Sequence, residues 1–440
     1  MMHAARRKGA RMTGRNPLLW LAFGGSLRRA FGGQLWLVLG SATLWFCCAC
    51  TSEAARNQDT EHFVRYPVAL AADPSGRFVF ALGANFDRSF RAGVLKVVDT
   101  ASDTFVAKDG VEIPSFGAGL AVQLAGSPTP TAVRLLATSR EDDSLTLVDL
   151  SGAVTPTLYC GIPDANGVCD SAHHYVDTTN LPIGNDPVDV AIAPLDATHV
   201  RVHVAATADG RVTILDMDTA PSPHKLPLTM VDHLLFGFGV SGVRVSPLTG
   251  RAYVSNNSTN ALYTYRVDGD GTTASPYTAA IDPTIILPSG GGGEYGRGMA
   301  LSTDGGRLYL AYRSPASIIV VDIAPMENGL PRNGIIDVIG VGRRPSEIAV
   351  APTGPGGSDL LYVSCFGEDA VWVVDPQRSA VVGTIRLKHA PYGLAATRVP
   401  GAKGWQLYAG LFDLNEIAVI PLVSHSSGAT SAVDFVKEAP

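Results

Sequence analysis

The sequence predicts an all-β fold, a seven-bladed β-propeller of four-stranded antiparallel blades. Three observations predict it. A similar unit recurs about every fifty residues along most of the chain. Each unit holds short β-rich runs separated by turn residues, as a propeller blade does. No stretch shows a helical period that competes with this pattern. One thin sheet cannot bury both of its faces, whereas sheets arranged around an axis bury each other's faces.

The first half of each unit contains an inner strand of small and apolar residues, a turn, and a second β-rich strand. The copy from Val240, for example, reads VSGVRVSPLTGRAYVSN. The clear copies begin at Tyr66, Asp186, Val240, Gly296, Arg343 and His389, and a weaker copy begins at Gly117. These starting points give seven units, and the loop from Thr155 to Pro187 is an insertion between two of them.

The second half of each unit is a β-rich run that usually ends in aspartate, and a fourth apolar run such as VVGTIRL often follows. At the first position of a type I turn, an aspartate carboxylate accepts backbone N–H bonds from residues two positions on. We expect this structural role for the repeated aspartates Asp99, Asp149, Asp216, Asp268, Asp322 and Asp375. The last copy, IAVIPL, lacks the aspartate.

Two segments are candidates to close the ring. Residues around EHFVRYP, before the first unit, resemble the outer strand TIRLKHAP, and the C-terminal AVDFVKEAP could fill the same position. Either segment would join the two ends and leave little free strand edge.

The first 50 residues read as an export signal, because basic residues precede the short apolar run QLWLVLGSATLWFCCAC. This run is shorter than the roughly 20 residues that span a bilayer as a helix. Its end resembles the bacterial lipobox, with Ala49 before Cys50, which implies lipid attachment at Cys50. Plain cleavage and an uncleaved anchor are the alternatives. Arg28 and Arg29 partly match a twin-arginine signal.

The domain plan is therefore an export signal in residues 1–50, a short linker in 51–59 and the propeller in 60–437. We expect an exported bacterial protein, periplasmic or anchored on the outer membrane by lipid alone, and a monomer. In an oxidising compartment, Cys160 and Cys169 are expected to form a disulfide across a turn-rich loop. Cys365 is expected to be a free, partly buried thiol.

The composition bounds the function. The chain has 440 residues, of which 17% are charged and 46% hydrophobic, as in a folded globular protein. Its formal net charge of −6, without a basic stripe, gives no electrostatic case for nucleic acid. No complete metal motif and no cofactor fingerprint is present, so we expect neither a metal nor a cofactor.

Two segments, YVSNNSTNALYTYRVD from Tyr253 and LYVSCFGEDAVWVVD from Leu361, resemble the YVTN-type repeats of bacterial secreted propellers. The resemblance extends loosely over residues 60 to 437 and implies the seven-bladed fold. Related propellers include lactonases, electron-transfer enzyme subunits and surface proteins. No catalytic residue of any such family matches a position of this chain.

Aligning the units places three charged residues where the other units have Gly or Ala. Asp189 and Glu347 fall in a column otherwise formed by Ala69, Gly119, Gly242, Gly298 and Gly393. Arg244 falls two positions further on, in a column of alanines. Inner strands converge near the axis, where burial of an unpaired charge costs free energy. A charged side chain there must therefore be paired or hydrated. We expect a structural ion pair, between Asp189 and Arg244 or across the channel, with a polar ligand site near the axis as the alternative.

Further polar residues cluster at the same end of the inner strands, where they would line the channel mouth, either as a solvated rim or as part of a pocket, for which this is a common position. They are Arg297, Arg344, His389 and Tyr392. Polar loops between second and third strands, such as SREDDS, FGEDA and LFDLNE, open on this face. His203 replaces a large apolar residue of the second strands and is expected to be a core histidine.

Three functions fit these features. The first is a non-catalytic propeller on the cell envelope that binds a protein, glycan or small molecule at its top face. The second is a lactonase-like hydrolase with Arg244, Glu347 and His389 at the channel mouth. The third is a redox-partner or cofactor-bearing subunit, which only Arg28 and Arg29 support. Because no catalytic set is recognisable, we expect binding rather than catalysis.

Overall fold

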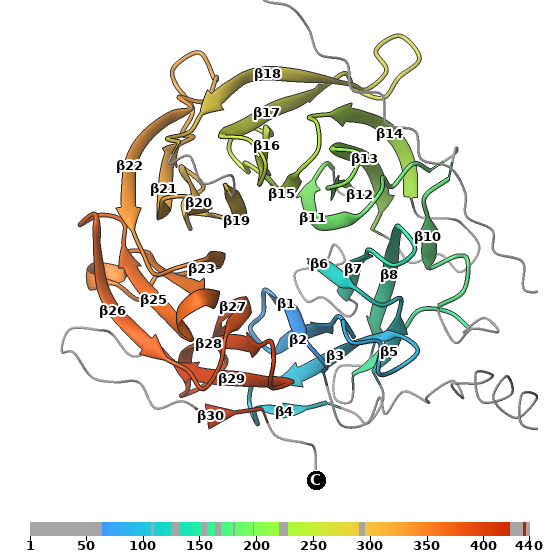
Figure 1. The fold of residues 1–440 in the computed structure, drawn as a ribbon. Helices are drawn as coiled ribbons and strands as arrows, with labels where there is room; N and C mark the ends of the chain where they lie inside the picture. Colours follow the sequence, from blue (N-terminus) through green and yellow to red (C-terminus); the bar gives the residue numbers. More distant parts are fainter. Residues whose placement is uncertain are drawn as a thin grey trace, which may run out of the picture. The chain divides into compact units, whose positions relative to one another are not determined.

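The computed structural model shows seven antiparallel β-sheets arranged in a ring, the fold that the sequence predicts (Figure 1). The structure describes residues 64–106, 110–124, 133–151, 156–162, 169–178, 181–196, 198–219, 228–289, 295–422 and 434–436. Residues 1–50, with Cys50, and the linker 51–59 lie outside the described residues. No helix in the described part of the chain is long and apolar enough to cross a membrane.

Each sheet, or blade, is a continuous stretch of chain that begins with its inner strand. We number the blades 1 to 7 in chain order. Blade 1 contains β1 (Pro67–Ala72), β2 (Phe78–Gly83), β3 (Gly93–Asp99), β4 (Thr104–Phe105) and β5 (Val111–Ile113). Blade 2 contains β6 (Gly117–Leu124), β7 (Val133–Ser139), β8 (Ser144–Ser151), β9 (Thr157–Tyr159) and β10 (His174–Val176). In both blades two short strands share the outer position, because β4 and β5 both pair with β3, and β9 and β10 both pair with β8.

Blades 3 to 7 have four strands each, in simple sequential order. Blade 3 contains β11 (Pro187–Pro194), β12 (His199–Ala206), β13 (Arg211–Asp218) and β14 (Leu228–Leu235). Blade 4 contains β15 (Val240–Val245), β16 (Ala252–Asn256), β17 (Ala261–Asp268) and β18 (Thr278–Ile286). Blade 5 contains β19 (Gly296–Leu301), β20 (Arg307–Arg313), β21 (Ala316–Asp322) and β22 (Gly334–Gly340).

Blade 6 contains the two short 3₁₀ turns of the described chain, and blade 7 contains strands alone. Blade 6 contains β23 (Pro345–Ala351), η1 (Pro355–Gly357), β24 (Leu360–Cys365), η2 (Phe366–Glu368), β25 (Ala370–Asp375) and β26 (Ala380–Arg386). Blade 7 contains β27 (Pro391–Val399), β28 (Gly404–Leu411), β29 (Glu416–Pro421) and β30 (Asp434–Phe435).

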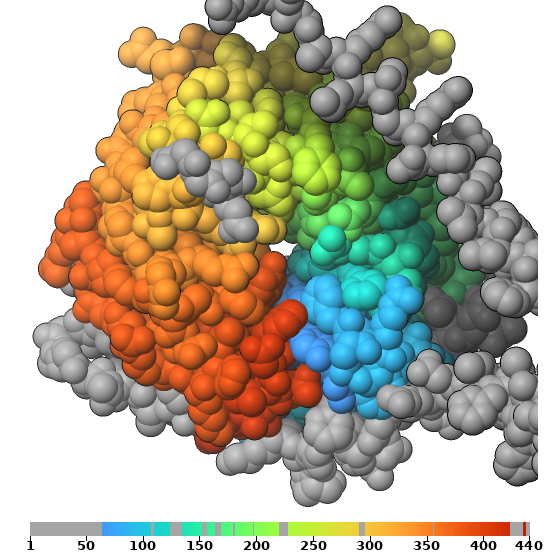
Figure 2. Space-filling view, in the orientation of Figure 1, coloured from blue at the N-terminus to red at the C-terminus, as the bar shows by residue number. Residues whose placement is uncertain are grey.

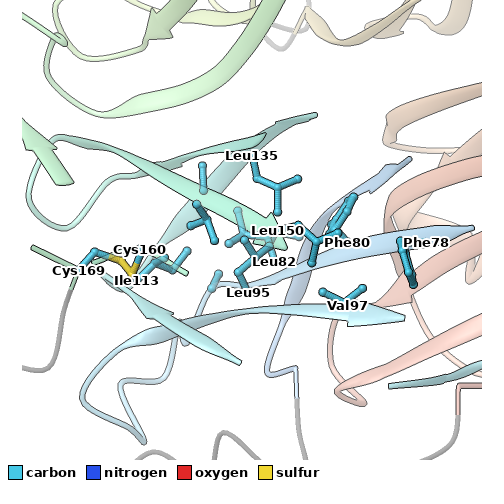
Figure 3. Close-up of a cluster of buried hydrophobic side chains, with 14 residues drawn as sticks. Phe78, Phe80, Leu82, Leu95, Val97, Ile113, Leu135, Leu150, Cys160 and Cys169 are labelled. Carbon is cyan, nitrogen blue, oxygen red and sulfur yellow. A yellow bond between two sulfur atoms is a disulfide. The ribbon is translucent and has the colours of Figure 1, made fainter. Parts of the chain in front are cut away.

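The buried apolar side chains of the described residues form seven clusters, and each cluster lies between two neighbouring blades. Figure 3 shows the cluster between blades 1 and 2, where Phe80 and Leu82 of β2 face Leu135 and Leu150 of blade 2. Burial of one such side chain contributes about 2 kcal/mol. The clusters therefore confirm that each blade buries its faces on its neighbours.

Blade 7 packs directly on blade 1 to close the ring (Figure 1). The C-terminal segment supplies β30, the outer strand of blade 7, so it does fill the position that the sequence suggested. It adds to its own blade, however, and no strand among the described residues crosses from one end of the chain to the blade at the other end. The seam is held instead by hydrogen bonds of the Tyr408 hydroxyl and the Lys403 ammonium to the Asp103 carboxylate, at 2.8 and 2.6 Å.

The predicted disulfide joins Cys160 and Cys169, whose Cα atoms are 5.1 Å apart. It closes the inserted loop between β9 and β10, and its sulfurs pack on Ile113 of blade 1 (Figure 3). Cys365 is a free thiol, as predicted, but it is fully buried and not partly buried. His203 is also buried as predicted: it shares a hydrogen bond of 2.5 Å with the Tyr265 hydroxyl, and burial lowers its pKa to about 3.

The repeated aspartates are not uniform turn residues. Asp99, Asp322 and Asp375 accept the backbone N–H two positions on, as predicted. Asp149 and Asp216 instead pair with an arginine on the neighbouring strand, Arg134 and Arg201, through Nε–Oδ1 contacts of 2.8 Å. Asp268 pairs with Arg266 on its own strand. The turn interpretation was wrong for these three, whose carboxylates bond to an arginine side chain and not to the backbone N–H two positions on.

Candidate functional site

The inner strands approach each other so closely that most of them have no room for a side chain. A Cβ on Gly393 of β27 would lie 2.8 Å from the Val68 carbonyl oxygen and 3.0 Å from the Ala69 Cα of β1. A Cβ on Gly298 of β19 would lie 2.5 Å from a carboxylate oxygen of Glu347. The glycine column therefore makes the space that the charged side chains of other blades occupy.

Every inner strand has a register shift near the first column. In β6 the shift lies between Gly117 and Leu120, and in β23 between Pro345 and Ile348. A bulge of this kind releases backbone groups from the ladder and turns side chains toward a site. In blades 2 and 6 a hydroxyl on the second strand accepts a released N–H: Thr138 Oγ1 accepts from Gly119 at 2.8 Å, and Ser364 Oγ accepts from Glu347 at 2.9 Å. In these two blades the bulge therefore positions Gly119 and Glu347 while their N–H groups stay paired.

A funnel of about 310 Å³ opens at the end of the axis where the inner strands begin, and an opening at the centre of the ring is visible in Figure 2. Its described lining residues are Val68, Phe86, Gly117, Ala118, Arg140, Val188, Thr207, Ser241, Arg297, Gly298, Arg313, Arg344, Glu347, Phe366, Tyr392 and Phe412. A smaller cavity of about 120 Å³ lies along the inner strands and shares Ser241, Gly298 and Glu347 with the funnel.

Asp189 and Arg244 line this smaller cavity and form the ion pair expected from the sequence. The Asp189 Oδ2 accepts hydrogen bonds from Arg244 Nη1 at 2.6 Å and from the Val243 N–H at 2.9 Å. Arg244 also donates from Nε to the Met299 carbonyl oxygen at 2.9 Å. Burial disfavours its charge, but the nearby carboxylates of Asp189 and Glu347 raise the pKa of Arg244. These bonds connect blades 3, 4 and 5, so the pair is part of the architecture.

Glu347 borders both cavities and differs from Asp189 in its partners. Among the described residues, no donor forms a hydrogen bond to its carboxylate. Burial raises the pKa of Glu347 to about 7; Arg244 lowers it and the Asp189 charge raises it again. Near neutral pH this carboxyl can therefore hold or release a proton inside the funnel.

Four arginines line the funnel among its described residues, against one carboxyl, Glu347. Arg140 is neutralised by an ion pair with Asp186. Arg313 is fixed by hydrogen bonds from Nε to the Pro345 carbonyl oxygen and from Nη2 to Ser346 Oγ. Arg297 has its Nε buried with no hydrogen-bond partner in the described structure. The described lining therefore has more arginines than carboxyls, and the Arg297 Nε is a buried donor without a partner among the described residues.

Aromatic rings form the other side of the funnel. Phe366 comes from blade 6, Tyr392 and Phe412 from blade 7, and Phe86 from blade 1. Phe412 is at the centre of the group, with ring centroids 5.4 Å from Phe86, 5.8 Å from Phe366 and 6.0 Å from Tyr392. None of the four side chains is fully buried, so part of each ring faces the cavity.

Of the seven residues predicted at the channel mouth, four line the funnel: Arg297, Arg344, Glu347 and Tyr392. Asp189 and Arg244 lie in the smaller cavity. His389 does not line either cavity; it is half exposed and its Nδ1 lies 3.3 Å from the Asp413 carboxylate. His389 lies just before β27, in an exposed position on the rim. There Asp413, on the next loop, holds the imidazole ring outside the funnel.

Several lining residues were not singled out from the sequence. Arg140, Phe86, Phe366 and Phe412 lie in loops that were expected to open on this face, but the loops were noted only for their polar residues. Ser241, Thr207 and Arg313 are ordinary residues of the repeat, and only the ring brings them together. In the described part of the chain, no three His, Cys, Asp or Glu side chains group as a metal site.

Comparison with known proteins supports the fold. No family model and no curated protein sequence matches this chain. Among solved structures, a protein from Lactobacillus plantarum matches with a TM-score of 0.57 and 15% identity, covering 83% of this chain and 97% of that one. The Kuenenia stuttgartiensis hydrazine synthase matches with a TM-score of 0.53 and 14% identity, over 85% and 99% of the two chains.

A third similar structure is the periplasmic gluconolactonase of Pseudomonas aeruginosa, with a TM-score of 0.52 and 18% identity. The match covers 76% of this chain and 89% of that enzyme. Identities this low show a shared propeller fold alone.

Proposed function

We propose that this protein is a non-catalytic binding protein of the bacterial cell envelope whose axial funnel holds a small anionic molecule. The observation that carries the proposal is the guanidinium of Arg297, whose buried Nε has no partner among the described residues. An unpaired buried donor costs free energy, and an anion that reaches it would form a charge-assisted hydrogen bond. The export signal and lipid attachment at Cys50 expected from the sequence would place this funnel outside the cytoplasm.

The size and rigidity of the funnel also support a small ligand. Its volume of about 310 Å³ is in the range of small-molecule sites. Arg313 is already held by the Pro345 carbonyl oxygen and Ser346 Oγ. A side chain fixed before binding loses little conformational entropy when the ligand arrives. The inner strands that bear the other groups are locked by close backbone packing at Gly298 and Gly393.

Arg297→Gln should weaken the binding of a small carboxylate by about tenfold or more, because a buried charge-assisted hydrogen bond is lost. The probes are phenylacetate and cyclohexylacetate, with neutral phenylacetamide for comparison, and calorimetry measures the affinity. The matched control is Arg266→Gln, which removes an arginine from the outer region of blade 4. Equal binding of the neutral amide, or no binding of either acid, would contradict the proposal.

A lactonase-like hydrolase is the second candidate, and the raised pKa of Glu347 favours it. An ionised Glu347 would take a proton from water as the oxygen attacks the lactone carbonyl. The same group would return the proton to the ring oxygen as the C–O bond breaks. Arg297 or Arg313 would stabilise the negative oxygen formed between these steps. Turnover of simple lactones that is lost in Glu347→Gln would establish this function, and a lactone panel without turnover would reject it.

The protonation of Glu347 also predicts how stability depends on pH. With the pKa raised from 4.5 to about 7, the folded protein keeps a proton that the unfolded chain releases. This group therefore makes the fold less stable as pH rises from about 4.5 to about 7. Glu347→Gln should remove the loss: we expect it to be more stable than the native protein at pH 8, by about 2 kcal/mol.

Urea unfolding at pH 5 and pH 8 measures the difference in stability between Glu347→Gln and the native protein. Glu416→Gln, at a partly exposed carboxyl, is the control. At pH 5 the difference between the native protein and Glu347→Gln should be less than half of that at pH 8, because the pH has then risen only slightly above about 4.5, where the loss begins. An equal difference at pH 5 and pH 8 would mean that Glu347 does not titrate in this range.

A further inference from the structure

The two sides of the funnel differ in chemistry, and this difference limits the ligand. The aromatic side comes from blades 6, 7 and 1, and the arginines Arg297 and Arg313 come from blade 5. Thr207 and Ser241, from blades 3 and 4, extend the polar side. A ligand that fills the funnel must therefore be apolar on one side and anionic on the other.

The aromatic side is a surface and not part of the core. Phe86, Tyr392 and Phe412 are partly buried side chains that pack against the cluster between blades 1 and 2 from outside. Leaving several ring faces in contact with water costs free energy that burial under a ligand would recover. Tilted and edge-on ring contacts already join the members of the group, so the rings are fixed in place before any ligand binds.

Arg344 joins the two sides of the funnel. Its guanidinium carbon lies 5.5 Å from the centroid of the Phe366 ring, a cation–π contact at the funnel wall. The backbone of Arg344 has a φ of 56°, which is a left-handed conformation, and β23 begins at the next residue. A planar guanidinium beside exposed ring faces can stack on a flat ligand and can also pair with the negative charge of that ligand.

We propose that the ligands of this funnel are planar aromatic acids. The ring of the ligand packs against Phe412, Phe366 and Tyr392, and its acidic group binds the free Nε of Arg297. The inference rests on the proposed function and narrows it, because binding of an anion alone would not need the aromatic side. Aromatic contacts favour an unsaturated ring over a saturated one of the same size.

The test compares two acids of equal charge and similar size, phenylacetate and cyclohexylacetate, on the full-length protein. We expect phenylacetate to bind about fivefold to tenfold more tightly. Phe412→Leu keeps an apolar side chain but removes the central ring, so this preference should fall to about twofold or less. Phe238→Leu, which changes an exposed aromatic that does not line the funnel, is the matched control and should keep the preference.

The outcomes separate this inference from the proposed function. Equal binding of the two acids, or tighter binding of cyclohexylacetate, would overturn the aromatic preference and leave anion binding in place. If neither phenylacetate nor cyclohexylacetate binds, both proposals fall. Loss of the preference in Phe412→Leu with thermal unfolding unchanged would support the inference, because a misfolded variant would lose stability as well.

Discussion

Gly119→Ala should destabilise the protein by about 2–3 kcal/mol, although the change adds only one methyl group. A Cβ on Gly119 would lie 2.6 Å from the Asp189 Cα and 3.0 Å from the Asp189 carbonyl carbon. These are backbone atoms of the next blade and cannot move aside as a flexible side chain would. The inner strands of blades 2 and 3 must separate, and the cluster between them loses contacts.

The measurement is the free energy of unfolding in urea, with the slope compared between variants. Gly383→Ala is the matched control, since a Cβ there meets only the Val373 side chain at an ordinary 3.7 Å. Alanine in a strand is otherwise slightly more stable than glycine, so this control should be neutral or stabilising. Equal stability of Gly119→Ala and the native protein would show that the inner strands are not closely packed.

Asp189→Ala should cost about 3 kcal/mol, because it leaves the Arg244 guanidinium in the interior without its carboxylate. The Val243 N–H loses the same acceptor. Replacing both members, as Asp189→Ala with Arg244→Met, should restore more than half of the lost stability, since no charge is then left unpaired. Urea unfolding of the two single variants and the double variant gives the coupling between them.

The control for this cycle is Asp268→Ala, which breaks an ion pair with Arg266 on the solvated side of blade 4. Exposed pairs contribute little, so its unfolding should match that of the native protein. If Asp189→Ala were as mild as the control, water in the cavity would be an adequate partner for Arg244. The ion pair would then not be part of the architecture.

The sequence was sufficient to predict the repeat, because every blade requires small residues where its inner strand packs near the axis. Asp189 and Arg244 are charged where the other units have Gly or Ala, and this difference was enough to predict their ion pair. The disulfide between Cys160 and Cys169 was predictable too, since both thiols lie in one turn-rich insertion. These features depend on local pattern or on alignment of units, and both are visible in a single chain.

The funnel lining was only partly predictable, because it depends on which loops meet. Phe366 and Phe412 are about fifty residues apart in the chain and become neighbours only when blades 6 and 7 pack together. The place of His389 beside Asp413 on the rim, outside both cavities, depends on the same meeting of loops, since Asp413 belongs to another loop. The bulges in the inner strands leave no residue signature, because hydroxyls such as Ser364 Oγ that satisfy them are common in strands.

The way the ring closes has a consequence for how the chain can assemble. Each blade is complete within its own stretch of sequence, and the contact between the last and first blades is of the same kind as the other six. The interface between blades 7 and 1 is therefore structurally equivalent to the other six, although it joins the two ends of the propeller. Evolution, or a designer, can move the chain ends to another seam and keep the funnel intact.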